Sequence, residues 1–454
     1  KLLWDISSIG PSWKDLDRIS TSQRFLEDEV ALESSRLLTS RNARNILRNC
    51  IHNKNAQEPN FVSYFYNLIS WGGNNSGPGP DTQYRVRGGT QAIPLSIAKK
   101  LLAATTSTTK QIHEGEESVV SHSSRPHHCK ILLNSPVMKI HHRQDNEVVV
   151  VTTQSGRTFH AKTGGVILTG SPSSLQRHIK LEYSTTTPQT DLLYSLDSHP
   201  TSIIDTEPTP KPIEPPRNKM PMGCCIKFMA VFNKRGPWWR HKDYNLQGDI
   251  LSCYLPQNLS LPIGQFDNGR TEYVPIFPYC FDVSPYSQDC GVLCCFLEGD
   301  IVYNYFRSQT KEDQESLLQE FLRLSFEDIV AKKHHVGMNQ TPTQQGQEFS
   351  RDETIPTDSQ PLWQPDYFVY HDWGVDTEPY VGGAYTSYFP PNTLSQDKYW
   401  QAYRAMATDL IPPNIYLAGS DYHCGFGNGY IEGAIRSGQE AADHILDRFS
   451  TVSR

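Results

Sequence analysis

The stretch that most constrains this fold covers residues 415–443, near the C-terminal end of the 454-residue chain. It begins with an apolar run at 415–418, which predicts a short buried strand. A glycine-rich turn follows, and residues 430–448 predict a helix with small side chains along one stripe. Free N–H groups at a helix start suit a phosphate, and glycines let a ligand approach closely. The same pattern also occurs as a plain structural connection, so ligand binding and simple packing both stay open on these residues alone.

Length and composition define the class of protein. The chain is long enough for two or three domain-sized units, and 37% apolar and 11% aromatic residues are sufficient to bury a core. The formal net charge of −7 argues against nucleic acid as the main partner. No uninterrupted apolar run reaches the roughly 18 residues that a membrane span needs, so we expect no membrane span.

Cysteines and histidines indicate no metal site. The ten cysteines include the pairs Cys224-Cys225 and Cys294-Cys295 but no Cys-x-x-Cys, which argues against a zinc ribbon or a redox motif. We expect most of them to be buried free thiols. The neighbouring histidine pairs lack ligand spacing, so no metal is predicted. Asn-x-Ser/Thr sequons arise by chance in a chain rich in Ser and Thr, so secreted and intracellular locations both stay open.

Residues 415–443 resemble the C-terminal flavin-binding segment of the flavin-containing amine oxidases, the family of monoamine, polyamine and L-amino-acid oxidases. In that family Ala-Gly followed by an acid, a glycine turn, Gly-Tyr-Ile-Glu-Gly-Ala and Ser-Gly lies against FAD. The resemblance covers most of residues 1–449 and is strongest at 84–102, 223–240 and 380–443. It implies a mixed α/β fold of two domains, a Rossmann-like FAD domain and a substrate domain of sheet and helices.

The resemblance also implies how the chain is divided. The expected units are substrate-domain helices at 1–82, FAD-binding segments at 83–218 and 376–454, and a substrate-binding domain at 219–375. Helical spacing predicts helices at 13–53, 61–71 and 315–332. Apolar runs and alternation predict strands at 131–140, 147–153, 158–162, 165–169, 223–232, 250–255, 273–281 and 291–298. Polar or proline-rich stretches predict loops at 103–128, 184–222 and 333–361.

FAD contacts are implied in three separate segments. Gly88 and Gly89 resemble the Gly-Gly segment that passes close to the flavin, and Val137 resembles the position that meets the adenine end. On their own, the two glycines would be a tight turn and Val137 a core residue. In the C-terminal segment the implied contacts are Gly419, Ser420, Asp421, Gly429, Tyr430 and Ile431. Ala384 falls where animal monoamine oxidases carry the cysteine bonded to the flavin, so FAD is expected to be bound non-covalently.

Four residues are implied as the active site. Lys227 interrupts an apolar run and matches the lysine near flavin N5; an edge lysine is the alternative. Tyr385 and Tyr430 match the two aromatic residues whose faces flank the substrate amine, where ring quadrupoles favour an amine. Core packing with a bonded hydroxyl is the alternative for each tyrosine. Trp373 matches the tryptophan near the substrate cavity.

One family motif is absent. FAD enzymes of this class begin with a βαβ unit carrying Gly-x-Gly-x-x-Gly, and this chain has no such motif after a strand. The proline turn at 77–80 does not match it. We therefore expect the chain to be the larger, C-terminal part of an oxidase, without the C-terminal membrane anchor of some relatives. The first part would be a separate FAD-binding polypeptide, as after proteolytic processing, or would be missing.

The resemblance implies oxidation of an amine to an imine, reduction of O2 to hydrogen peroxide, and hydrolysis of the imine by water. Three hypotheses stay open: an amine oxidase, an L-amino-acid oxidase, and a truncated, non-catalytic homologue that cannot retain FAD. An L-amino-acid oxidase needs a cation for the substrate carboxylate, whereas tyrosine rather than tryptophan at Tyr430 favours amines. The expected partners are a small amine or amino acid and O2, and a homo-oligomer is left open.

Overall fold

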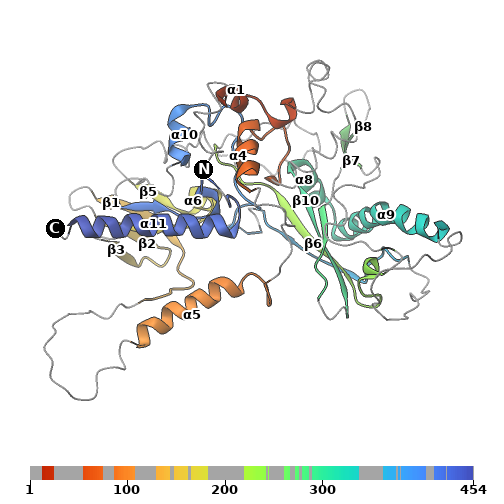
Figure 1. Ribbon diagram of the computed structural model, residues 1–454, viewed down its shortest axis with the longest axis horizontal. Helices are drawn as coiled ribbons and strands as arrows, with labels where there is room; N and C mark the ends of the chain where they lie inside the picture. The colour runs from red at the N-terminus through yellow and green to blue at the C-terminus, as the bar shows by residue number, and fades with distance from the viewer. Residues whose placement is uncertain are drawn as a thin grey trace, which may run out of the picture.

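A computed structural model of the protein describes residues 13–24, 55–74, 86–107, 129–143, 148–161, 165–182, 219–241, 244, 260–265, 271–275, 279–285, 289–336, 361–374, 377–378, 380–404, 414–425 and 427–452. These residues form two lobes, each built around its own four-stranded sheet (Figure 1). The elements expected at 25–53 and 250–255 lie outside the described residues, as does most of the loops expected at 103–128, 184–222 and 333–361. The loop expected from 103 is wrong at its start, because a helix continues to Ser107.

The sheet of the first lobe has the strand order β3-β2-β1-β5. Its strands are β1 (Val137–Arg143), β2 (Val148–Thr153), β3 (Thr158–Ala161) and β5 (Lys180–Glu182). A second, parallel pair joins β4 (Val166–Leu168) to β12 (Ile415–Leu417), and the long helix α11 (Ile431–Val452) follows. The strand predicted at 131–140 is wrong in its first half. Asn134 has a φ of +52°, and Pro136 has no N–H to donate to a ladder, so regular pairing begins only after the proline.

Aromatic side chains fill the core of the first lobe. They come from α1 (Trp13–Arg18), α4 (Tyr64–Asn74) and α10 (Asp397–Arg404). The ring centroids of Trp13 and Phe65 lie 5.1 Å apart, and those of Phe65 and Trp400 lie 5.5 Å apart in an edge-to-face arrangement. The same buried cluster contains side chains of β1, β4 and β12, so the N-terminal helices share one core with these strands.

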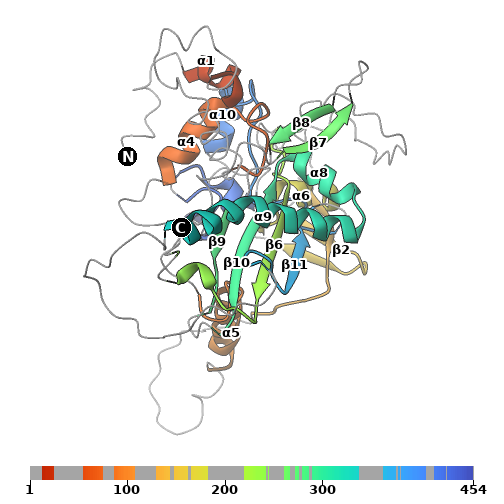
Figure 2. The same cartoon turned by 90° about the vertical axis from the view of Figure 1, so that its right-hand side faces the viewer.

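The sheet of the second lobe has the order β11-β6-β10-β9 and is antiparallel in each pair. Its strands are β6 (Cys225–Phe232), β9 (Tyr279–Asp282), β10 (Gly291–Glu298) and β11 (Tyr367–Asp372). Alternate residues of β6, among them Ile226 and Phe228, are buried beneath α9 (Lys311–Val336), which crosses one face of the sheet (Figure 2). The Phe228 and Phe321 rings lie 5.4 Å apart across this interface. The predicted helix at 315–332 is confirmed and extends at both ends.

The single strand predicted at 273–281 is wrong. The structure has β8 (Thr271–Pro275), which pairs with β7 (Ser260–Gln265), and the separate strand β9 of the main sheet. The sequence carries prolines at Pro275 and Pro278, which cannot donate backbone hydrogen bonds and so interrupt a ladder.

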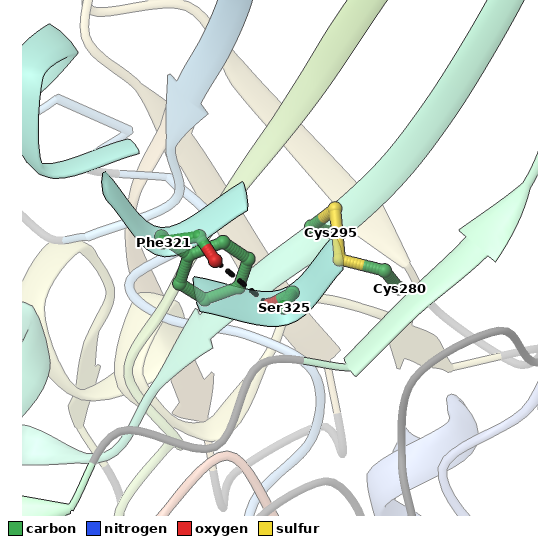
Figure 3. The surroundings of a disulfide bond; sticks show 4 residues. All are labelled: Cys280, Cys295, Phe321 and Ser325. Carbon is green, nitrogen blue, oxygen red and sulfur yellow. Dashed lines mark hydrogen bonds between the residues drawn. A yellow bond between two sulfur atoms is a disulfide. The ribbon is translucent and has the colours of Figure 1, made fainter. Parts of the chain in front are cut away.

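One cysteine pair departs from the expectation of free thiols. Cys280 on β9 and Cys295 on β10 are direct register partners and form a disulfide, with their Cα atoms 4.1 Å apart. The disulfide lies beneath α9, where the Ser325 hydroxyl donates to the Phe321 carbonyl (Figure 3). The other described cysteines are free, as expected.

Three of the described α-helices were not predicted: α10, given above, and two others. Helix α6 (Pro172–His178) lies where only a turn was expected; the Ser171 hydroxyl caps it by accepting from Ser174 N, and proline occupies the first helical position. Helix α8 (Asp300–Ser308) follows β10 directly. None of the described helices is long and apolar enough to cross a membrane.

Candidate functional site

The glycine turn between β12 and α11 is organised by Asn428. Its side-chain amide donates to the Tyr403 hydroxyl at 3.0 Å and to the His423 carbonyl at 2.9 Å. The Tyr66 hydroxyl donates to the Asn428 side-chain oxygen at 3.2 Å. These bonds hold the turn against α4 and α10. Sequence reasoning selected the glycines on either side of Asn428 but missed Asn428 itself, whose partners are far away in the sequence.

The small residues of α11 pack on the turn itself. Gly433 N donates to the Gly427 carbonyl at 3.1 Å, and a Cβ on Gly433 would lie 2.2 Å from that oxygen. The Ser437 hydroxyl donates to the Gly419 carbonyl at 3.0 Å and accepts from Gly419 N at 2.8 Å. Ala441 is fully buried in the same seam. The small side chains of this stripe therefore allow the backbone of the glycine turn to pack against α11.

The start of α11 presents a different surface. Tyr430 and Ile431 are 49% and 50% exposed. The N–H groups of Ile431 and Glu432, in the first helical turn, have no backbone acceptor among the described residues. This end therefore combines free donors, the positive end of the helix dipole and an apolar ring face.

A short segment, residues 384–387, bridges the two lobes. Ala384 N donates to the Gly223 carbonyl at 2.9 Å, and Gly223 N donates to the Thr386 carbonyl at 3.1 Å, at the entry to β6. On the other side, Asp421 accepts from the Thr386 hydroxyl at 2.7 Å and from Ser387 N at 2.6 Å. The carboxylate of Asp421 thus fixes the bridging segment to the turn after β12.

Tyr385, within this segment, reaches the sheet of the second lobe. Its ring meets the Phe296 ring edge-to-face at 5.2 Å. The Lys227 ammonium lies 5.7 Å from the centroid of the same Phe296 ring, and the two residues are direct register partners on β6 and β10. Because Lys227 alternates with Ile226 and Phe228, this cluster lies on the sheet face opposite α9. Phe296 was not predicted, since strand register is a long-range property.

Trp373 follows β11, the strand that pairs with the strand of Lys227. His371 of β11 is the register partner of Lys227, and the His371 and Trp373 rings lie 4.5 Å apart. Trp373 N donates to the Cys225 carbonyl at 3.3 Å, which continues the pairing past the end of the strand. Trp373 therefore lies opposite Cys225, two residues along β6 from Lys227.

The remaining predicted residues divide into two groups. Gly429 precedes Tyr430, and Thr386 follows Tyr385. A Cβ on Gly429 would lie 3.3 Å from the Thr386 side chain, so these two neighbours of the tyrosines are in contact. Val137, by contrast, packs against the core of the first lobe. Gly88 and Gly89 are exposed, with φ values of +83° and +84°, and a Cβ on either would meet nothing within 4 Å. The described residues do not bring these three next to Lys227 or Tyr385.

A buried acid was missed by the sequence reasoning. Glu298, the last residue of β10, is 5% exposed, and neither carboxylate oxygen has a hydrogen-bond partner among the described residues. Burial raises the pKa of Glu298 to about 8. Its register partner is Cys225, whose pKa is raised by burial and then by the Glu298 charge. The signal in the sequence was a lone charge at the end of the apolar run 291–298.

The family model described as "Flavin containing amine oxidoreductase" matches residues 81–324 and 355–446. The chain belongs to this family. Horse amine oxidase [flavin-containing] A is 35% identical over 95 residues, which are 21% of this chain and 16% of that protein. Pig amine oxidase [flavin-containing] B is 23% identical over 234 residues, 52% of this chain and 33% of that protein. The aligned region thus spans a third or less of each relative.

Solved structures of flavin amine oxidases share the fold. Cyclohexylamine oxidase from Brevibacterium oxydans IH-35A superposes with a TM-score of 0.61 at 17% identity, over 97% of this chain and 70% of that chain. Wild-type putrescine oxidase bound to putrescine gives a TM-score of 0.59 at 16% identity, over 96% of this chain and 70% of that chain. The expected mixed two-domain fold of this family is therefore confirmed.

Family membership implies a flavin, and the start of α11 fits one side of a flavin site. Its free N–H groups suit the polar edge of a flavin ring, and the exposed Tyr430 ring suits a flat apolar neighbour. The Gly-x-Gly-x-x-Gly motif that holds the pyrophosphate is not in the sequence. No group of three or more His, Cys, Asp or Glu side chains in the described part of the chain is arranged to hold a metal ion.

Proposed function

We propose that this protein carries the substrate-binding part of an enzyme that oxidises an amine to an imine with FAD and reduces O2 to hydrogen peroxide. The observation that carries this proposal is the cluster of Lys227, Phe296 and Tyr385, joined through Thr386 and Gly429 to the exposed start of α11. The cluster combines a cation with aromatic faces beside the flavin-fitting helix end. Family neighbours that act on small amines support the same substrate class.

FAD, when bound, accepts the hydride and passes the electrons to O2. The protein's part is to bind the amine, orient its carbon–nitrogen bond and exclude water. We assign Tyr385 and Tyr430 to the two sides of the substrate amine and Trp373 to the cavity wall. A poorly solvated aromatic site disfavours the ammonium form and so lowers the pKa of the substrate amine. We propose that Lys227 holds a water molecule beside the flavin ring.

Glu298 favours an amine oxidase over an L-amino-acid oxidase. Its carboxyl lies on the same sheet face as Phe296, two residues further along β10. An amino-acid substrate brings its own carboxylate, which needs a cation, and an acid that burial keeps protonated supplies none. The described residues thus place a buried acid on this face, beyond the Lys227 ammonium that lies over Phe296.

We assign the flavin contacts of this chain to Gly419, Ser420, Gly429, Tyr430 and Ile431. Asp421 supports the same site indirectly, because one of its carboxylate oxygens accepts hydrogen bonds from the Thr386 hydroxyl and from Ser387 N. Ala384 carries no thiol, so FAD is held without a covalent bond, and acid precipitation releases all of it into the supernatant. Flavin that stays with the pellet contradicts this assignment. Gly88, Gly89 and Val137 remain assigned to the dinucleotide side, and the domain division at 82, 218 and 375 remains part of the proposal.

We propose that a dinucleotide-binding βαβ unit, in the same polypeptide or in a separate one, covers exposed apolar residues of this chain. Helix α5 (Ala92–Ser107) stands away from both lobes (Figure 1), and Leu95 and Ile97 on it are 60% and 52% exposed. Leu133 in the segment before β1 is 80% exposed. Exposed apolar side chains of this kind suit an interaction surface. Residues 1–454 alone should bind no FAD, and addition of a unit with Gly-x-Gly-x-x-Gly should restore binding; FAD bound by residues 1–454 alone contradicts the assignment.

A peroxide assay on the flavin-loaded protein, with matched panels of amines and L-amino acids, tests the function. Peroxide from amines is the expected result; peroxide from amino acids alone contradicts it. Lys227→Met should keep FAD bound but slow flavin reduction or reoxidation, on the order of tenfold or more. Lys311→Met makes the same change at an exposed position and should leave both rates unchanged. An unchanged rate in Lys227→Met removes Lys227 from the site.

A further inference from the structure

The backbone around Trp373 is tied by one carboxylate, that of Asp372, the last residue of β11. Its Oδ1 accepts from Gly374 N and from the Tyr303 hydroxyl, each at 2.7 Å, and its Oδ2 lies 3.1 Å from Arg307 Nε. Burial, and then the bond to Asp372, raise the pKa of Tyr303, so the phenol stays protonated as a donor. Because a carboxylate that accepts from the N–H two residues on closes a turn, the turn fixes the backbone of the residue between, Trp373.

Helix α8 supplies two of these donors from one face. Tyr303 and Arg307 are four residues apart and therefore lie above one another on the helix. Asp300, three residues before Tyr303, lies on the same face and accepts from the Cys224 thiol at 2.9 Å, next to the start of β6. Helix α8 is thus attached to both strand ends that meet at Trp373, the start of β6 and the end of β11.

Asp372 faces away from the proposed substrate face. It is the register partner of Ile226, which is buried beneath α9, whereas His371 is the register partner of Lys227. Successive residues of a strand point to opposite faces, so Asp372 lies on the side of the sheet that Lys227 does not share. The His371 ring contacts the Trp373 ring on the substrate side. Any effect of Asp372 on the substrate therefore passes through Trp373.

We propose that Asp372 is a positioning residue that holds the Trp373 indole in place beside a bound amine. The inference rests on the proposed amine oxidation, in which Trp373 forms a wall of the substrate cavity. Without this carboxylate, the backbone of Trp373 loses its turn and the end of β11 loses its attachment to α8. A wall residue displaced by about 1 Å misorients the substrate and can lower the rate by as much as about 100-fold.

The alternative is that Asp372 only stabilises the end of a strand. Asp282 offers a matched control, because it makes the same kinds of bond at the other edge of the same sheet. Its carboxylate accepts from Ser284 N, two residues on, at 2.9 Å, from Trp239 Nε1 at 2.9 Å, and from Arg240 Nε. Asp282→Ala should therefore destabilise the sheet as Asp372→Ala does, but leave the substrate wall in place.

A double-mutant cycle on the flavin-loaded enzyme, with benzylamine as substrate, separates the two roles. Asp372→Ala should lower kcat/KM by about tenfold or more, whereas Asp282→Ala should change it by less than about twofold. In the Trp373→Ala background, Asp372→Ala should also change kcat/KM by less than about twofold, because the residue through which it acts is gone. Asp372→Asn, which keeps an acceptor for Gly374 N, should recover part of the loss. Equal losses in both backgrounds overturn the inference.

Fluorine spectra of protein labelled with fluorotryptophan test the same placement without any activity. The chain has eight tryptophans, and the resonance absent from Trp373→Phe belongs to Trp373. Asp372→Ala and the size-matched Tyr303→Phe should shift or broaden this resonance, whereas Asp282→Ala should not. An unchanged resonance in Tyr303→Phe overturns the inference even where Asp372→Ala fails to fold. If the flavin-loaded wild type oxidises no amine, the proposed function fails separately, and these spectra still decide whether Asp372 positions Trp373.

Discussion

Gly433→Ala tests whether the start of α11 rests on the glycine turn. A Cβ at this position would lie 2.2 Å from the Gly427 carbonyl oxygen, 2.8 Å from its carbonyl carbon and 3.2 Å from Asn428 N. All three atoms belong to the backbone, so no side-chain rotation relieves the contact. Overpacking of this kind costs about 1–3 kcal/mol, more than the gain of up to about 1 kcal/mol that alanine brings to a helix. We expect a net loss of about 1–2 kcal/mol.

The same helix supplies the control. A Cβ on Gly438 would meet nothing within 4 Å, so Gly438→Ala should gain helix propensity without a clash and stabilise the protein by about 0.5–1 kcal/mol. Urea unfolding followed by far-ultraviolet circular dichroism measures both variants against the wild type. The midpoint should fall for Gly433→Ala and rise for Gly438→Ala. Equal shifts of the two midpoints would refute the contact between helix and turn and, with it, the fixed geometry of Tyr430.

Three further predictions concern stability. The pKa of Glu298 is raised from 4.5 to about 8, so the folded state binds this proton more tightly than the unfolded state does. The folding stability gained from the proton is lost as the pH rises from 4.5 to about 8. Glu298→Gln should therefore gain stability over the wild type by roughly 1 kcal/mol per pH unit between pH 5 and pH 7.5, read from urea midpoints; a constant difference contradicts the buried acid. Replacing Cys280 and Cys295 together by alanine opens a loop with a sequence separation of 15 and should cost about 3 kcal/mol; a reductant should lower the melting temperature of the wild type but not of the double variant. Asp421→Ala should cost roughly 2–4 kcal/mol and release flavin, because the bonds from Thr386 and Ser387 are lost together; retained flavin contradicts the bridge.

Local sequence patterns predicted the elements that carry the site. The apolar run at 415–418, the strand at 223–232, the strand at 291–298 and the helix after the glycine turn all occur with small shifts at their ends. Each is determined by residues within one element, where periodicity and turn chemistry act directly. The helix cap at Ser171 is encoded in the same local way, as a serine followed by proline.

Features that depend on the pairing of distant segments could not be predicted in this way. The disulfide between Cys280 and Cys295 and the placement of Phe296 opposite Lys227 both follow from strand register, which one sequence does not reveal. Glu298 was missed for the same reason: it lies opposite Cys225 and two residues from the register partner of Lys227 only because β10 pairs with β6. Tyr385 and Trp373 were predicted through the resemblance, which carries the pairing of a known fold, and their roles stay predictions.

The cluster of Lys227, Phe296 and Tyr385 lies between two cores that pack independently. Its geometry therefore depends on the bridging segment 384–387. Lys227 and Phe296 are held by the sheet beneath α9, whereas Gly429 and Tyr430 are held by the turn that Asn428 organises. Neither core alone sets the distance between these groups. That distance depends on the backbone bonds of the bridging segment to Gly223 and on its bonds to Asp421. A substitution at Asp421 should therefore change the geometry of Tyr385 relative to Lys227 while both lobes keep their own folded cores.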